Sequence, residues 1–96
     1  MSGTLVDTIL AAIRSGNFIV SRHGARRLRQ RKIPLVQIED ETLAAERAAI
    51  QLRVNSKPNP TIMVELVLAD GTPVVAIWSW MKDHEAAQLV TVYFPD

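Results

Sequence analysis

Residues 61–81 read TIMVELVLADGTPVVAIWSWM, and this stretch decides the fold. Its first part, residues 61–69, is rich in β-branched and other apolar side chains, which is typical of a strand. Asp70-Gly71 is a strong signal for a tight hairpin turn. The return segment Pro73–Met81 is almost continuously apolar, which favours a strand buried on both faces. The stretch therefore predicts a β-hairpin whose second strand lies in the centre of a sheet.

Two further strands are predicted on either side of this hairpin. Residues 50–55 alternate between apolar and polar side chains, which indicates a half-buried strand. The turn-rich run 56–60, with two prolines, separates that strand from the hairpin. Residues 89–94 form the predicted last strand after a polar loop at residues 81–85. The second half of the chain is therefore expected to supply four strands.

The first half of the chain has helical periodicity instead. Apolar side chains recur at helical spacing over residues 5–15 and 34–48, and residues 22–32 form a shorter, strongly basic helix. Phe18–Val20 is either an extended connector or a short strand. The expected fold is a single α+β domain over residues 1–96, with two or three N-terminal helices packed on one face of a four-stranded, mostly antiparallel sheet.

Composition limits the classes of function. The 96 residues contain no cysteine, which excludes disulfides, thiol catalysis and cysteine-ligated metal. No stretch approaches the roughly 20 apolar residues that span a bilayer, and residues 1–7 do not resemble a secretion signal. There is no glycine-rich phosphate loop or nucleophile elbow. We therefore expect a cytoplasmic protein with no membrane partner, no metal and no cofactor.

Charge is sorted along the chain although the net charge is only +1. No acidic residue lies between Asp7 and Glu39, and seven Lys and Arg residues do. Six of these, together with one of the two histidines, fall in residues 21–33, SRHGARRLRQRKI. On a helix, His23, Arg27 and Arg31 recur at i, i+4 and i+8 and share one face. A segregated basic block is either a phosphate-binding surface or a solvated helix face.

Two segments carry a resemblance to a known family. Residues 23–33, HGARRLRQRKI, resemble the signature His-Ala-x-x-Arg-Met-x-x-Arg-Gly-Ile of domain-of-unknown-function family 4258. Residues 90–96, VTVYFPD, are similar to that family's last strand, Ile-Thr-Val-Tyr-Glu-Pro-Asp. The spacing between the two segments also agrees, so the resemblance covers roughly residues 18–96. Gly24, Lys32 and Phe94 depart from the usual alanine, glycine and acid.

The resemblance implies a fold similar to the RelE and BrnT toxins, small ribonucleases of bacterial toxin–antitoxin pairs. Such a ribonuclease needs proton-transfer groups and cations that stabilise the charge on the phosphate. An imidazole suits proton transfer near neutral pH, and the arginine fork binds phosphate with two parallel hydrogen bonds. The candidate catalytic residues are His23 as general acid/base, Arg27 and Arg31 as phosphate clamps and Tyr93 as an auxiliary donor. The surrounding phosphate-binding residues would be Arg22, Arg26, Arg29 and Lys32.

Structural explanations compete with these roles. His23 could bond to nearby backbone, and Arg27 and Arg31 could pair with the acids at 39–41. Tyr93 is more often a packing aromatic, and His84 lies in a charged, solvated loop. The two tryptophans at 78 and 80 share one strand face, where core or partner interface is favoured over base stacking.

Three hypotheses of function remain. The first is a RelE- or BrnT-like endoribonuclease that acts on free or ribosome-associated RNA and is neutralised by a cognate antitoxin protein. The second is a module that binds RNA or a protein through the basic helix without catalysis. The third is a structural homodimer whose tryptophan strand forms the interface.

Overall fold

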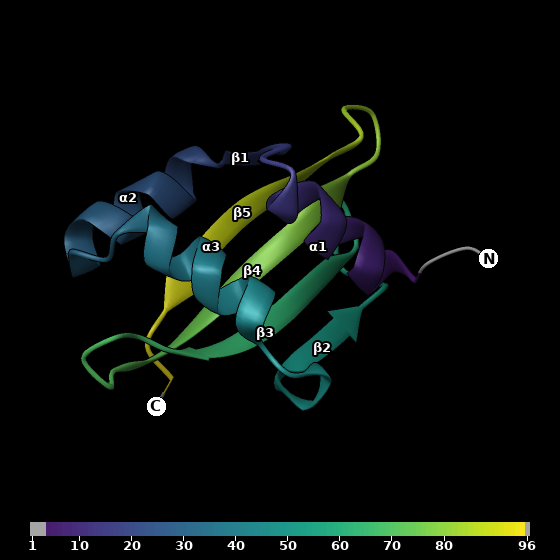
Figure 1. Cartoon of the computed structure of the whole chain (residues 1–96). Coiled ribbons are helices and arrows are strands. Elements are labelled where there is room, and N and C mark those ends of the chain that lie inside the picture. The colour runs from purple at the N-terminus through teal and green to yellow at the C-terminus, as the bar shows by residue number, and fades with distance from the viewer. Residues whose placement is uncertain (1–3, 96) are drawn as a thin grey trace.

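Five strands form one mixed sheet in the order β1-β5-β4-β3-β2, as Figure 1 shows for the computed structural model, which describes residues 4–95. The predicted hairpin is confirmed as β3 and β4, and β4 is the central strand of the sheet. The Asp70-Gly71 turn closes it, because Gly71 adopts a φ of +89° and the Asp70 carboxylate accepts from the Thr72 amide at 3.0 Å. The strands are β1 (Phe18–Val20), β2 (Ile50–Arg53), β3 (Thr61–Val67), β4 (Pro73–Met81) and β5 (Ala86–Tyr93).

The expectation of four strands is wrong, because Phe18–Val20 forms a fifth strand. This strand, β1, pairs in parallel with β5, with Phe18 opposite Ala87 and Val20 opposite Leu89. Phe18 and Val20 pack against the core, and Ile19 between them points to the other face and is 48% exposed. Three residues give too short a pattern to identify a strand, and β1 forms because the edge of β5 offers it backbone partners.

Helices cover one face of the sheet and one of its edges. In Figure 1, α1 and α3 lie in front of the sheet and α2 lies to the side, beside β5. None of the helices within residues 4–95 is long and apolar enough to cross a membrane. The helices are α1 (Leu5–Arg14), α2 (Arg22–Arg31) and α3 (Leu35–Ala44), followed by the short 3₁₀ turn η1 (Arg47–Ala49).

The third helix ends four residues earlier than its periodicity predicts. The backbone of Ala45 is extended, with φ −66° and ψ 139°, and this directs the chain into η1 and then into β2. Alanines at 45, 48 and 49 continue the helical rhythm in the sequence, but alanine fits many environments and does not mark where a helix stops.

Trp78 lies at the centre of the core. Its side chain is 0% exposed, and its indole Nε1 donates a hydrogen bond to the Thr42 hydroxyl at 3.2 Å. The Phe18 ring meets it edge-on, with 5.4 Å between the ring centroids. Trp80 is half-buried against the same cluster. The tryptophan strand therefore contributes to the core, as favoured from the sequence, and it tethers α3 to the sheet.

Candidate nucleic-acid interface

Ser21 joins the start of helix α2 to β5. The Ser21 amide donates to the Leu89 carbonyl at 3.0 Å and continues the ladder that β1 begins. The Ser21 hydroxyl donates to the Val90 carbonyl at 2.8 Å and accepts from the Gly24 amide at 2.8 Å. Ser21 therefore caps the first turn of α2 and joins it to the sheet.

Gly24 brings the backbone of α2 close to β5. A Cβ atom at this position would lie 2.8 Å from the Leu89 carbonyl oxygen and 3.2 Å from that of Val90. Both neighbours are backbone atoms of β5 that accept hydrogen bonds from Ser21, so they cannot rotate away as a flexible side chain could. The short distance between the α2 backbone and β5 therefore explains why glycine occupies this position.

The solvent-facing side of α2 carries a continuous row of cations. Arg22, Arg26 and Arg29 recur at i, i+4 and i+7, and all three are exposed. We call these three residues the basic ridge. His23 is exposed next to the ridge, and Lys32 is exposed at the C-terminal end of the helix. All four residues predicted as the surrounding phosphate-binding field are therefore exposed.

The predicted row of His23, Arg27 and Arg31 turns from solvent toward the sheet. An α-helix advances 400° over four residues, so a row at this spacing rotates by about 40° per step. His23 at the start is exposed, whereas Arg27 and Arg31 are half-buried. The Arg31 guanidinium lies over the Phe94 ring, 4.5 Å from the centroid, and its Nε is buried without a hydrogen-bond partner among residues 4–95.

Tyr93 is on β5, and α2 packs along that strand. It pairs with Val75 of β4 and points to the sheet face that faces away from the core, since its neighbour Val92 is buried in the core. No hydrogen bond within residues 4–95 joins the Tyr93 hydroxyl to His23, Arg27 or Arg31. The structure therefore aligns three of the four candidate catalytic residues on one helix and places the fourth on the neighbouring strand.

The basic side chains of α2 are not neutralised by carboxylates in the described part of the chain. The proposed pairing of Arg27 and Arg31 with residues 39–41 is not formed: Arg27 instead makes a long 3.5 Å hydrogen bond to Gln30. The ion pair that does form joins Arg47 to Asp7 on the surface of α1. The electrostatic footprint expected from the sequence is therefore present on the folded surface.

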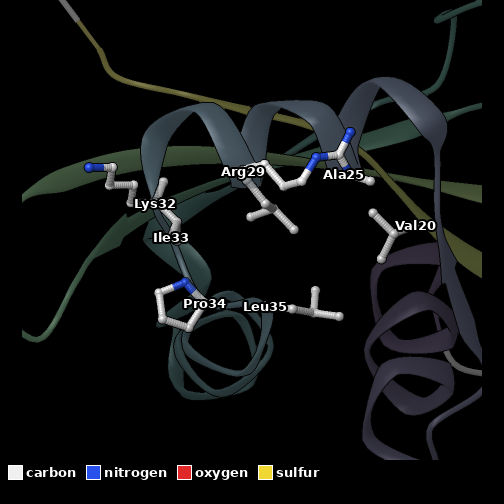
Figure 2. Close-up of a pocket in the computed structure, with 8 residues that line it drawn as sticks. Val20, Ala25, Arg29, Lys32, Ile33, Pro34 and Leu35 are labelled. Carbon is white, nitrogen blue, oxygen red and sulfur yellow. The ribbon is translucent and has the colours of Figure 1, made fainter.

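An open groove of about 460 Å³ lies on the other flank of α2, against the start of α3. Figure 2 shows Ala25 and Arg29 on one side of it, Pro34 and Leu35 on the other, and Val20 at one end. His23, Arg27, Arg31 and Tyr93 do not line it. Sequence reasoning missed this groove, and its only signal was the thin apolar stripe on the second helix.

Within residues 4–95, no group of three or more His, Asp or Glu side chains is placed to hold a metal ion, and His84 is exposed in a turn. Comparisons with models of known protein families, with curated proteins and with solved structures find no match to this chain.

Proposed function

We propose that this protein binds RNA through α2, with phosphates held by the basic ridge. The observation that carries the proposal is that the ridge is exposed and that no carboxylate in the described chain pairs with it. Phosphate is the ligand that best fits a row of free guanidinium groups, because each guanidinium donates two parallel hydrogen bonds and keeps its charge. The resemblance to RelE- and BrnT-like ribonucleases favours RNA over other polyanions, and the cytoplasm as the site of action.

Salt dependence tests this proposal directly. We expect binding of a labelled single-stranded RNA to weaken steeply with salt, and Arg26→Gln to reduce the slope by about 0.7 for the lost phosphate contact. Arg53→Gln is the matched control, because Arg53 is exposed on β2 at the opposite edge of the sheet. Equal effects of the two substitutions, or binding that does not respond to salt, would contradict the proposal.

Cleavage of the bound RNA is the second candidate function, and the exposure of His23 beside the ridge favours it. In this mechanism the imidazole takes the proton of a 2′-hydroxyl, whose oxygen attacks phosphorus and expels the 5′-oxygen, which takes up a proton. Arg27 and Arg31 would stabilise the charge that develops on the phosphate oxygens, and Tyr93 would donate to the leaving group. The product would be a 2′,3′-cyclic phosphate.

A cleavage assay separates the two candidates. If the protein is a ribonuclease, His23→Ala should lower the cleavage rate by about 10²-fold or more, while RNA affinity stays within about twofold. Arg27→Ala should also slow cleavage, because it removes a cation beside the reacting phosphate. The assay is run with naked RNA and with ribosomes. Identical rates in the wild type and both variants, or no cleavage under either condition, would leave RNA binding as the function.

A further inference from the structure

The groove between α2 and α3, which we call the α2–α3 groove, combines an apolar floor with positive charge. Leu28 and Ile33 form buried parts of its lining, and Val20 and Leu35 are half-exposed at its sides. Nearly all of the surface between them is apolar. Such a surface is suited to apolar side chains of a ligand.

Two cations lie at the rim of the groove. Arg29 and Lys32 line it and are exposed, and neither forms an ion pair with a carboxylate in residues 4–95. In Figure 2 the Arg29 guanidinium extends along the upper edge toward Ala25, and the Lys32 ammonium points outward at the opposite end. A ligand with apolar groups in the middle and carboxylates at both ends would complement this arrangement.

The start of α3 adds a third positive element. Pro34 is the N-cap residue of this ten-residue helix and makes no side-chain capping bond, so no side chain accepts from the amides of the first turn. Pro34 and Leu35 themselves line the groove. The partial positive charge of an uncapped helix start favours a carboxylate nearby.

The backbone of Lys32 gives an independent reason to assign a role to its side chain. Lys32 adopts φ 56° and ψ 44°, a left-handed conformation that glycine takes without strain and that is unfavourable for residues with a Cβ atom. The resembling family has glycine at this position. The chain instead carries a strained lysine whose side chain lies at the rim of the groove, and such strain is commonly retained where the side chain is used.

We propose that the α2–α3 groove is the docking site for an acidic, amphipathic segment of a protein partner. Apolar side chains of the segment would occupy the floor, and its carboxylates would face Arg29, Lys32 and the start of α3. The groove is open to solvent, and its lining extends from Val20 along α2 to Leu35 at the start of α3. This extent suits a polypeptide better than a compact small molecule. The groove shares Arg29 with the basic ridge, but the docking proposal does not rest on RNA binding.

The test uses two synthetic 14-residue helical peptides built from leucine, alanine and one charged residue, glutamate in the first and lysine in the second. Each is titrated into the ¹⁵N-labelled protein and followed by NMR. We expect the glutamate peptide to shift the amides of Ala25, Leu28 and Leu35, and the lysine peptide to bind at least tenfold more weakly. Equal binding of the two peptides, or shifts confined to other surfaces, would overturn the proposal.

Variants make the test specific to the groove. Lys32→Gly should weaken binding of the glutamate peptide about threefold. Because this substitution also relieves backbone strain and raises Tm, the loss of affinity cannot be ascribed to unfolding. Leu35→Asp should weaken binding of the glutamate peptide at least fivefold. Val67→Asp, at an exposed apolar position on β3, should leave this affinity unchanged. Unchanged affinity in Lys32→Gly and Leu35→Asp would refute the assignment.

Two controls identify the occupant. Leu35→Asn adds no charge near Arg29 and is expected to weaken the glutamate peptide while keeping wild-type RNA affinity, so a failure of RNA binding and a failure of peptide docking are seen in separate measurements. Shifts of the groove amides that grow with protein concentration in the absence of peptide would show that a second copy of the chain fills the groove, and would overturn the proposed partner.

Discussion

Replacing Gly24 with alanine tests how closely α2 is seated on the sheet. In an ordinary helix, replacing glycine with alanine stabilises the helix by about 1 kcal/mol, because alanine is the better helix former. Here the new Cβ would lie 2.8 Å from the Leu89 carbonyl oxygen and 3.2 Å from the Ser21 hydroxyl oxygen. Relieving such overpacking costs about 1–3 kcal/mol, and moving α2 away also weakens the Ser21 hydrogen bonds, worth about 1 kcal/mol.

We therefore expect Gly24→Ala to lower the free energy of unfolding by about 1–2 kcal/mol. At roughly 4–8 °C per kcal/mol for a domain of this size, Tm should fall by about 5–15 °C. Urea and thermal denaturation followed by circular dichroism measure both quantities. Gln30→Ala, at an exposed site on the same helix, is the control and should be neutral or slightly stabilising. A Gly24→Ala protein as stable as the wild type would refute the reasoning.

Three other predictions concern stability. Lys32→Gly should raise the free energy of unfolding by about 0.5–1 kcal/mol in urea denaturation, because relief of the left-handed strain exceeds the added freedom of the unfolded chain, whereas Lys32→Ala should not. Thr42→Val should lower the free energy of unfolding by about 1–3 kcal/mol in the same assay, because it leaves the buried Trp78 Nε1 without a hydrogen-bond acceptor. The Thr4 backbone amide, followed by the Thr4 hydroxyl and the Arg47 guanidinium, holds the pKa of Asp7 below its usual 3.8. Its carboxylate therefore stabilises the fold above that pH, and the Tm difference between wild type and Asp7→Asn should vanish as pH falls toward 2.

The sequence predicts the central hairpin well because several signals agree over residues 61–81. The apolar run, its length and the Asp70-Gly71 turn all indicate the same structure, and the structure confirms β4 as the central strand. By contrast, the sequence does not predict β1 clearly. Three residues carry no periodicity, and the strand depends on an edge of β5 supplied by the far end of the chain.

The candidate site likewise has one part that the sequence predicts and one part that it does not. Helical spacing places His23, Arg27 and Arg31 in one row, but spacing alone does not show which end of the row meets the sheet. The position of Phe94 determines this, because Arg31 packs over its ring. The α2–α3 groove depends on the angle between two helices, which the left-handed backbone of Lys32 sets. A local sequence pattern does not encode such an angle.

The pairing of β1 with β5 has a consequence for when the site becomes available. Ser21 bonds to Val90 across 69 positions of the chain, and α2 rests on the strand that is synthesised last among the five. A contact of such long range forms late, because the intervening chain must first be ordered. While residues 86–93 are still in the ribosome exit tunnel, a nascent chain has no platform for α2. The basic ridge can therefore take its folded position only after release of β5, so the cationic segment is synthesised well before its docking surface exists.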